Sequence, residues 1–501
     1  MTQGMFELPL YAYAFVCFLA LFCLWRWKRN PLNAINTAGG PSVPLLSYIG
    51  ALRFQRHSHE MMLEGYRKYG RSVFKVAMPD QWLVCLNGPE LIDQVRKAPE
   101  SVMSSSEGLL FLTQLTHYLP LETFKDPYHS AVIRERLNRR LDDVLPSMMD
   151  ELRIVCDELL PPKQGDPVAL PGRKVILDIV ARAVSRTFVG LPYCRKTSYL
   201  DAAVTFTLDV IKSRFILTLF PEIMKGFVAR FIARGPANNI RRMAGLIGPL
   251  VRERIDLMEQ HAKDGSELPD DMLQWLLEEG SKRNDLTVEM AATRLQLLNF
   301  AALHTSSSSL VHALFHILAD PDLVPTLREE ARAALEAHGW TRGALEKMPK
   351  MDSFLKESQR LNGINVLGMS RRAMQDIVLA DGTFIPAGTL CVVPSYPPHH
   401  DEETYDGADD FKPFRFLDSK EAGSTRQQFV NTSDEFMAFG RGKHACPGRF
   451  FAAMELKVIL SYLLMNYDME LQDKSTGRPA NVHFGITILP SPSAVVVFKK
   501  R

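Results

Sequence analysis

The stretch that decides the fold reads Phe439-Gly440-Arg441-Gly442-Lys443-His444-Ala445-Cys446-Pro447-Gly448-Arg449-Phe450. It carries a single cysteine, Cys446, in a loop punctuated by glycines, and an apolar, helix-like run begins directly after it. The nearest other cysteine along the chain is Cys391. This isolation favours one thiolate on one metal ion over a disulfide or a four-cysteine zinc site. The alternative is a buried structural cysteine after a turn, because free cysteine is often buried.

The residues around Cys446 suit a flat, anionic partner. Gly440 and Gly442 let the backbone turn tightly and approach such a partner closely. Pro447 suits the first position of a helix, and the free amides of that helix start would favour the thiolate form of the cysteine. The loop also offers an aromatic ring and several cations: Phe439, Arg441, Lys443 and His444. A heme fits these features, with its iron on the sulfur and its propionates on the cations.

The spacing closely resembles the heme-binding loop of the cytochrome P-450 family, whose pattern is Phe-x-x-Gly-x-Arg-x-Cys-x-Gly. The matching residues are Phe439, Gly442, Cys446 and Gly448. His444 replaces the usual arginine, a variant that resembles fungal members. A histidine can still donate to a propionate, but its charge depends on pH. The resemblance implies that heme b (iron protoporphyrin IX) is bound through the cysteine.

Residues Thr293–Ala319 are expected to form one long, mostly apolar helix. Its segment Ala301–Ser306 resembles the oxygen-side helix of the family, Ala/Gly-Gly-x-acid-Thr-Thr/Ser. Small residues at 301 and at Ala302 would leave room for O₂, and Thr305 would bond the preceding turn and hold a water that supplies protons. The alternative is a core helix whose serine cluster bonds its own backbone.

His304 stands where the family usually has an aspartate or glutamate. An imidazole can also relay protons near neutral pH, because its reference pKa is ~6.5. We therefore expect a histidine-like pH dependence of activity if His304 is the relay.

Glu357 and Arg360 are three residues apart and share a face of a predicted helix. Most such pairs lie on the surface and contribute little to stability. Together with Arg415 in Pro413–Phe416, they resemble the family's Glu-x-x-Arg helix and its Pro-x-Arg-Phe segment. The resemblance implies a buried network of the three that holds the cysteine loop in place.

Further cations are candidates for the heme propionates. Arg371 and Arg372 precede a strand-like piece, where the family often has a propionate-binding arginine, and we prefer Arg371. Arg134 resembles the arginine of the family's Trp-x-x-x-Arg helix, although Ser130 takes the tryptophan position. We expect His129 to replace that missing contact, as it does in fungal relatives. Solvated surface cations are the alternative.

The composition excludes several other classes. The chain has 501 residues, 46% of them hydrophobic, and a net charge of +2. No long basic stretch with interleaved aromatics is present, so nucleic-acid binding is not expected. Seven scattered cysteines argue against a disulfide framework and for a reducing compartment.

The N-terminus predicts a membrane anchor. Leu8–Trp25 is uncharged and apolar, close to the ~20 residues that span a bilayer. Arg26, Lys28 and Arg29 follow, so the positive-inside rule orients the remaining chain to the cytosol. A cleaved signal peptide is the alternative. We therefore expect an anchor with its basic flank at 1–29, a Pro/Gly hinge at 30–50 and a heme-thiolate catalytic domain at 51–501. The family resemblance points to the endoplasmic reticulum.

Helical periodicity dominates from about Leu121 onward, and the strand-like pieces are few: Ser72–Ala77, Trp82–Leu86, Ile377–Leu379 and Thr389–Val393. A loop is expected at Pro161–Pro171. The predicted fold is mainly α with a small β part, as the cytochrome P-450 fold requires, preceded by one transmembrane helix.

The resemblance also places the substrate contacts, which are mostly apolar: Phe111, Leu112, Leu298, Ala301, Ala302, Ile364, Val366, Leu367, Phe484 and Ile486. An apolar small molecule, such as a terpenoid of fungal specialised metabolism, is the expected substrate.

The main hypothesis is a membrane-anchored monooxygenase that uses O₂ and electrons from an NADPH–cytochrome reductase. The expected basic docking face for the reductase comprises Arg441, Lys443, Arg449 and Lys457. Two alternatives keep the heme: a reductase-independent isomerase or dehydratase, and a non-catalytic sensor of gas or redox state.

Overall fold

The computed structural model describes residues 18, 21, 22, 25, 27–162, 165–232, 234–417, 428–475 and 477–501. The expected anchor at Leu8–Trp25 lies mostly outside these residues. Within the described part of the chain, no helix has the length and apolarity needed to cross a bilayer.

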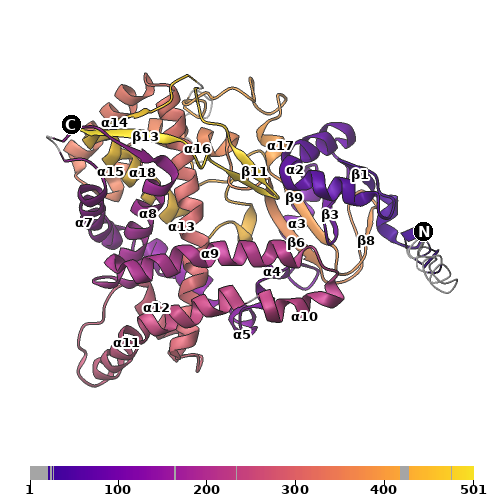
Figure 1. The fold of residues 1–501 in the computed structure, drawn as a ribbon, viewed down its shortest axis with the longest axis horizontal. Coiled ribbons are helices and arrows are strands. Elements are labelled where there is room, and N and C mark those ends of the chain that lie inside the picture. Colours follow the sequence, from indigo (N-terminus) through magenta and orange to yellow (C-terminus); the bar gives the residue numbers. More distant parts are fainter. Residues whose placement is uncertain are drawn as a thin grey trace, which may run out of the picture.

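Helices make up most of the chain (Figure 1). In chain order they are α2 (Ser47–Tyr69), α3 (Pro89–Lys97), α4 (Ser105–Thr113), α5 (Glu122–Lys125), α6 (Tyr128–Glu135), α7 (Leu141–Leu159), α8 (Gly172–Val189), α9 (Thr197–Leu217), α10 (Glu222–Ile232), α11 (Arg234–Asp264), α12 (Met272–Ser281), α13 (Val288–Ala319), α14 (Leu323–His338), α15 (Arg342–Glu346), α16 (Pro349–Leu361), α17 (Tyr396–His399) and α18 (Arg449–Asn466). The short 3₁₀ helices η1 (Pro31–Ala34) and η6 (Gly442–His444) also enter the argument.

The β part is small and divided among four sheets. Its strands are β1 (Asn36–Ala38), β2 (Phe74–Ala77), β3 (Trp82–Cys85), β4 (Met103–Ser104), β5 (Val168–Pro171), β6 (Leu367–Ala373), β7 (Ile377–Val378), β8 (Phe384–Ile385), β9 (Leu390–Pro394), β10 (Tyr467–Leu471), β11 (Val482–Phe484), β12 (Thr487–Leu489) and β13 (Val495–Lys500). The largest sheet has the order β1-β2-β3-β9-β6-β4, and β10-β13-β5 form a second one. The mainly helical fold with a small β part is confirmed.

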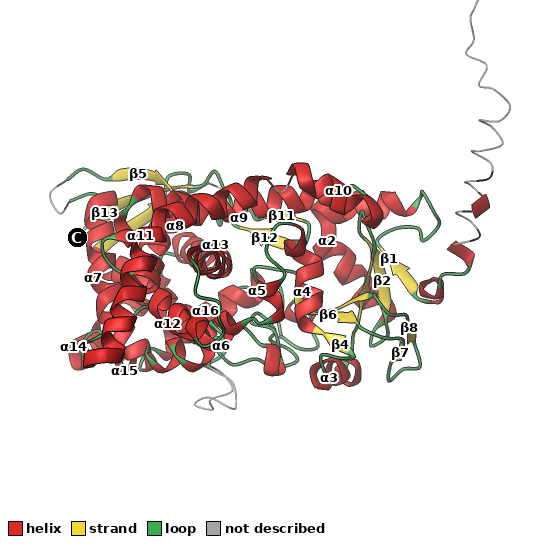
Figure 2. Cartoon of the chain, turned by 90° about the horizontal axis from the view of Figure 1, so that it is seen from below, coloured by secondary structure: helices red, strands yellow, loops and turns green. Residues whose placement is uncertain are grey.

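The expected long helix is α13, which begins earlier than predicted because Thr287 caps it by accepting a hydrogen bond from the amide of Met290. It runs through the middle of the molecule and is seen end-on in Figure 2. It contacts α8, α9, α11, α16 and α18. A helix that is apolar on all sides is stable only when other elements cover it on all sides, so α13 organises the core.

Two segments differ from the sequence-based prediction. The last part of the expected loop Pro161–Pro171 is β5, which pairs antiparallel with β13. The expected hinge at 30–50 contains η1 and β1, and β1 pairs in register with β2. Both strands are short and gain their partners from distant parts of the chain, so local periodicity does not reveal them.

Candidate active site

The cysteine loop is closed by its own backbone and seated by glycines. The amide of Cys446 donates to the carbonyl of Phe439 across 2.8 Å. Gly440 has φ +71° and a β-carbon there would lie 3.2 Å from the Gly368 carbonyl oxygen. Gly442 has φ +73° and its β-carbon would lie 2.7 Å from Cγ of Arg96. Both positions therefore need the left-handed backbone and the small volume of glycine.

The helix after the loop, α18, begins at Arg449 rather than at Pro447 as predicted. The amides of Gly448 and Arg449 still interact with the sulfur of Cys446 and lower the pKa of its thiol, as does the charge of Arg449. Burial has the larger, opposite effect, so the pKa of the thiol is raised overall. The expected thiolate is therefore not favoured by the chain alone, and a bound metal has to displace the proton.

Among the described cysteines, Cys446 is the exposed one and the other four are buried. Cys446 is accessible even though the surrounding chain desolvates its sulfur. The two observations agree if the thiol of Cys446 lines a recess rather than the outer surface.

The middle of α13 also has accessible surface. Ala301 is exposed and Ala302 and Thr305 are half-buried, although the helix on either side is buried. Protein interiors are close-packed, so accessible atoms on a central helix indicate an internal opening. The hydroxyl of Thr305 donates to the carbonyl of Ala301 across 2.6 Å and also lies 3.2 Å from that of Ala302. This is the bond to the preceding turn that the sequence predicts.

His304 is directed elsewhere. Its Nε2 lies 3.0 Å from the carbonyl oxygen of Val204, which belongs to α9. Burial lowers the pKa of the imidazole, and the bond to Val204 opposes this only in part. Because a carbonyl only accepts, Nε2 carries the proton and the side chain links α13 to α9 in its neutral form.

Three of the predicted cations influence one another electrostatically. Burial lowers the pKa of His444, and the charges of Arg371 and Arg134 lower it further. Arg371 is 3% exposed and its Nη1 donates to Ser105 Oγ across 3.1 Å. Its Nε has no hydrogen-bond partner among the described residues. His444 Nε2 is 3.0 Å from an oxygen of Glu100, without hydrogen-bond alignment.

Arg372 and His129 have other neighbours. Arg372 lies 3.8 Å from a Glu107 oxygen and over the ring of Phe111. His129 Nδ1 accepts from Nη1 of Arg294 across 3.2 Å, and burial lowers the pKa of His129 to about 4. The imidazole is therefore neutral, with its Nε2–H left as a donor. The sequence motifs that suggested the propionate contacts did not indicate that Arg294 is the partner of His129.

Glu357, Arg360 and Arg415 form one buried cluster. Glu357 accepts from Arg360 Nε and Nη2 at 2.7 and 2.8 Å and from Arg415 Nε at 3.0 Å. It also accepts from the amide of Lys412 at 3.0 Å. The side chains of Glu357 and Arg360 are 0% exposed and that of Arg415 is 11% exposed.

The cluster reaches the cysteine loop through a residue that the sequence did not suggest, His399. Nη1 of Arg360 donates to the carbonyl of His399. Nε2 of the same histidine accepts from the amide of Met437 across 3.1 Å, just before the loop. Burial lowers the pKa of His399 to about 3, which keeps Nε2 able to accept. Sequence alone could not indicate His399, because its partners Arg360 and Met437 are distant from it along the chain.

The predicted docking cations are not equivalent. Lys457 is buried and pairs with Asp352 at 2.5 Å, so it cannot belong to an outer basic face. Arg441 pairs with Asp434 at 2.8 Å, and Lys443 is exposed. The prediction of Lys457 as a docking residue is therefore wrong, because the turn of α18 that carries it faces the core.

Several expected substrate contacts meet in one apolar cluster: Phe111, Leu112, Val366, Leu367 and Ile486. Leu298 belongs to the main core instead, and Phe484 is exposed at 38% and packs against Phe215.

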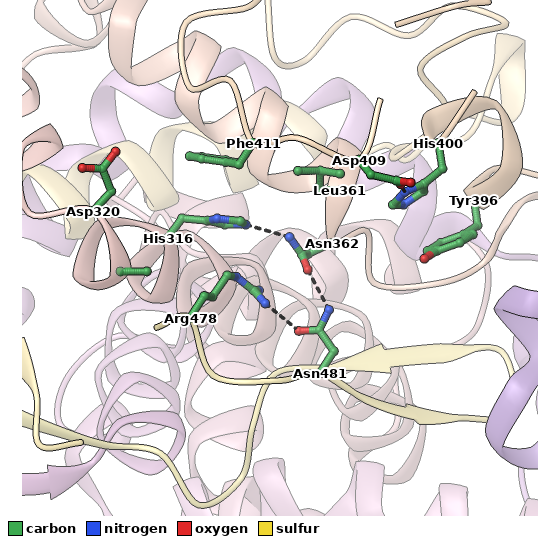
Figure 3. A pocket seen from close by; sticks show the side chains of 11 residues that line it. His316, Asp320, Leu361, Asn362, Tyr396, His400, Asp409, Phe411, Arg478 and Asn481 are labelled. Carbon is green, nitrogen blue, oxygen red and sulfur yellow. Dashed lines mark hydrogen bonds and ion pairs between the residues drawn. The ribbon is translucent and has the colours of Figure 1, made fainter. Parts of the chain in front are cut away.

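A separate cavity of about 520 Å³ lies near the C-terminal end of α13 (Figure 3). A chain of hydrogen bonds crosses it from His316 through Asn362 and Asn481 to Arg478 (Figure 3). Its lining contains none of the site residues predicted from the sequence.

Comparison with known proteins agrees with this geometry. The chain matches the family model described as cytochrome P-450 over residues 38–497. It is 40% identical over 497 residues to cytochrome P-450 monooxygenase 151 of Postia placenta, covering 98% of this chain and 99% of the relative. It is 33% identical over 492 residues to a cytochrome P-450 monooxygenase of Ganoderma lucidum, covering 97% and 96%. It is 31% identical over 474 residues to the cytochrome P-450 monooxygenase paxP of Penicillium paxilli, covering 92% and 90%.

The chain therefore belongs to the cytochrome P-450 family. It is a monooxygenase of that family, an oxidoreductase whose cofactor is heme and which uses O₂, a redox-partner reductase and a small-molecule substrate. The residues present fit the cofactor. The thiol of Cys446 is accessible, and a buried Nε of Arg371 without a partner in the described structure provides a donor for an anionic group.

Proposed function

We propose that this protein oxidises an apolar small molecule, a terpenoid or related specialised metabolite, with O₂ and electrons from an NADPH-dependent cytochrome reductase. The observations that carry the proposal are the accessible thiol of Cys446 and the accessible surface in the middle of the central helix α13, at Ala301 and its neighbours. Bound heme supplies the activation of O₂ and the oxidation of a C–H bond.

The chain's own residues hold and orient that cofactor in this proposal. Cys446 binds the iron, and the amides of Gly448 and Arg449 stabilise the sulfur's charge. Arg371, with its unpartnered Nε, and His444 donate to the propionates.

Arg134 adds positive charge to the propionate side, and His129 offers its Nε2–H as a donor. Phe439 would provide an apolar contact for the cofactor. Arg372 is left out of this proposal because it is engaged with Glu107 and Phe111.

Thr305 positions water on the oxygen side. Its hydroxyl hydrogen is donated to Ala301, so its oxygen lone pairs are free to accept. Ala302 leaves the space that O₂ and this water need.

The proposed substrate site is the apolar cluster that contains five of the expected contacts. The guanidinium of Arg372 lies over the ring of one of them, Phe111, and the other four are aliphatic. An apolar substrate is favoured because burying an unpaired charge in such a site is costly.

The reductase is proposed to dock on the outer side of the cysteine loop. Lys443 is exposed there, and Arg441 and Arg449 are partly exposed neighbours. Cations at this position would meet an acidic partner and speed its association, most strongly at low salt.

The proposed location is the endoplasmic reticulum membrane, with residues 8–25 as a single-pass anchor and the catalytic domain facing the cytosol. An apolar face on the described part of the chain supports a membrane surface as neighbour. It comprises exposed residues of α10 and of the start of α2: Ile223, Met224, Phe227, Phe231, Tyr48, Ile49 and Leu52. Both helices lie toward the end of the molecule where the described chain begins (Figures 1 and 2).

The cofactor assignment is tested by the carbon monoxide difference spectrum of the reduced protein. We expect a thiolate-type Soret band in the wild type, its loss in Cys446→Ser and its retention in Cys194→Ala, which changes a buried free cysteine elsewhere. Persistence of the band in Cys446→Ser would contradict the assignment.

The reaction class is tested by product analysis with and without NADPH and reductase, using an extract of fungal terpenoids. Products that require both support the monooxygenase. Products formed without either would indicate the isomerase or dehydratase, and an intact spectrum without NADPH consumption would indicate the sensor.

The membrane contact is tested by flotation with vesicles of endoplasmic reticulum lipid composition. We expect a protein lacking residues 1–29 to bind partially, and Ile223→Ser with Phe227→Ser to abolish that residual binding. The control, Leu191→Ser, changes an exposed leucine between α8 and α9 and should bind like the parent. Equal binding by all three truncated proteins would exclude the apolar face.

A further inference from the structure

An arginine on the buried face of α9 lies beside an internal opening. Arg214 is half-buried, whereas Val210 and Leu217, one turn before and one turn after it on the same face, are 1% and 0% exposed. Protein interiors are close-packed, so accessible atoms between two buried turns indicate an opening within the molecule. The Nε of Arg214 donates to the carbonyl of Leu112, in the last turn of α4. Leu112 belongs to the apolar cluster of the proposed substrate site, so Arg214 borders that cluster.

Most of the guanidinium of Arg214 is unused by the protein. An arginine side chain carries five N–H donors, and only the one on Nε has a partner here. Within the described part of the chain, Nη1 and Nη2 have no hydrogen-bond acceptor and no carboxylate at ion-pair distance. Burial lowers the pKa of Arg214, and Asp80 and Tyr118 oppose this only in part. The group nevertheless stays charged, because an arginine does not release its proton in a protein.

The carboxylate that acts on Arg214 is already paired with another cation. Asp80, between β2 and β3, lies 2.7 Å from Nζ of Lys225 on α10, and the two side chains are 3% and 0% exposed. Glu222 is the second partner of Lys225, at 2.8 Å, but its side chain is exposed. Away from bulk water, the group therefore holds two cations and one anion. A desolvated charge without a partner is costly, so this arrangement favours the binding of one monovalent anion.

The same helix face leads from Arg214 to the middle of α13. The ring of Phe206 on α9 packs edge-to-face against that of Phe300, with 6.4 Å between the ring centroids, and Phe300 directly precedes Ala301. In Figure 1, α9 crosses α13 and continues toward α4 and α10, and it contacts all three helices. Arg214 follows Phe206 by eight residues, which is about 12 Å at 1.5 Å per residue. The guanidinium and the accessible part of α13 thus lie at two ends of one stretch of α9.

Capping of α4 explains only part of this arrangement. A cation near the last carbonyls of a helix is stabilising, and the Nε–H of Arg214 satisfies one of these carbonyls. One N–H group is enough for that role. It leaves both Nη groups and the desolvated charge without an explanation.

We propose that Arg214 binds a carboxylate of the substrate, so that the substrate is an apolar acid. The proposal rests on the proposed monooxygenase function and narrows its substrate class. A planar guanidinium pairs with both oxygens of a carboxylate, and one carboxylate supplies the single negative charge that this group of side chains favours. The apolar body lies against the cluster that contains Leu112. Oxidation then occurs about 12 Å from the acid group, the length of α9 between Phe206 and Arg214.

The first measurement compares two ligands that differ in charge. An ω-(imidazol-1-yl)alkanoic acid and its methyl ester both bind the iron of the heme-loaded protein through the imidazole, and the shift of the Soret band gives each Kd without turnover. In a series of increasing chain length, the carboxylate reaches Arg214 only when the chain spans the distance along α9. At that length, the ratio of the ester's Kd to the acid's Kd should be about ten- to a hundredfold larger in the wild type than in Arg214→Gln, the effect of a hydrogen bond to a charged group. With short chains, the two proteins should give the same ratio.

The variants separate acid binding from a structural role of Arg214. Glutamine keeps an N–H donor for the carbonyl of Leu112 and removes the charge. A purely structural role would change the affinities for acid and ester alike and leave their ratio unchanged. Lys212→Gln removes an exposed positive charge two residues away on α9 and should keep the wild-type ratio. Arg214→Lys keeps the charge without the planar fork, so its ratio should lie between those of the wild type and Arg214→Gln. If Arg214→Gln fails to retain heme, Arg214→Lys decides the question.

The second measurement identifies the substrate class by turnover. An extract of fungal terpenoids is divided, and the acids in one half are converted to methyl esters. With NADPH and reductase, the wild type should consume acids of the untreated half and none of their esters. In Arg214→Gln, kcat/KM for these acids should fall about ten- to a hundredfold, chiefly through KM.

The proposal is overturned if the ratio in the wild type equals that of the decisive Arg214 variant at every chain length, or if the wild type consumes the esters as readily as the acids. Failure of the proposed function has a different signature. The wild type would then consume no NADPH in the presence of reductase, while the Kd ratios, which need no turnover, would still report on Arg214.

Discussion

Replacement of Glu357 by glutamine is expected to destabilise the protein severely while leaving the shape of the side chain almost unchanged. The carboxylate accepts four hydrogen bonds, two from Arg360, one from Arg415 and one from the amide of Lys412. Glutamine keeps one acceptor oxygen and turns the other into an NH₂ group that faces a guanidinium donor. The guanidinium groups of Arg360 and Arg415 would then lose the carboxylate with which both of them pair.

The size of the effect follows from this burial. Removing one partner of a fully buried charge cluster costs about 3–5 kcal/mol. A domain is stable by only about 5–15 kcal/mol in total, so Glu357→Gln should lose a large part of the free energy of unfolding. The loss should reach the cysteine loop, because Arg360 holds His399 and His399 holds the amide of Met437.

The assay is urea unfolding of the heme-loaded protein, together with the heme content and the carbon monoxide spectrum after purification. The matched control is Glu329→Gln. Glu329 pairs with Arg332 at the same i,i+3 spacing and a distance of 2.6 Å, but the two side chains are 63% and 54% exposed. The control should retain heme and unfold like the wild type. Equal stability and heme content of the two variants would refute the reasoning from burial.

Three other outcomes are expected. His304→Ala should lower the free energy of unfolding by about 1 kcal/mol, through loss of the bond to Val204, without changing the acidic limb of the pH–activity profile; a shift of that limb would restore the imidazole as relay. Glu455→Gln should remove a pH dependence of stability. Burial raises the pKa of Glu455 from 4.5 to about 8, so between these pH values the folded protein keeps a proton that the unfolded chain has released. The free energy of unfolding of the wild type should therefore fall by about 1.4 kcal/mol per pH unit relative to the variant in this range, as urea titrations would show. Gly440→Ala should reduce heme content, because φ is +71° and the new methyl group meets the Gly368 carbonyl; normal heme content would contradict the close fit.

The sequence by itself determined the class of protein and most of its elements. The spacing around Cys446 and the long apolar run of α13 are local patterns, and periodicity along one helix or the order of residues in one loop is enough to recognise them. The mainly helical fold and the pairing of Glu357 with Arg360 follow from the same kind of local spacing.

The tertiary structure decided what the neighbouring elements contribute. His304 is a candidate proton relay by its place in the motif, and α9 places a backbone carbonyl 3.0 Å from its Nε2. Lys457 was expected on an outer face and lies in the core. Glu455 on α18 is buried only by the tertiary packing of that helix, and this burial raises its pKa to about 8. Hydrogen-bond partners and burial depend on which distant segments meet, so local spacing names the candidate groups while packing sets their charge and their role.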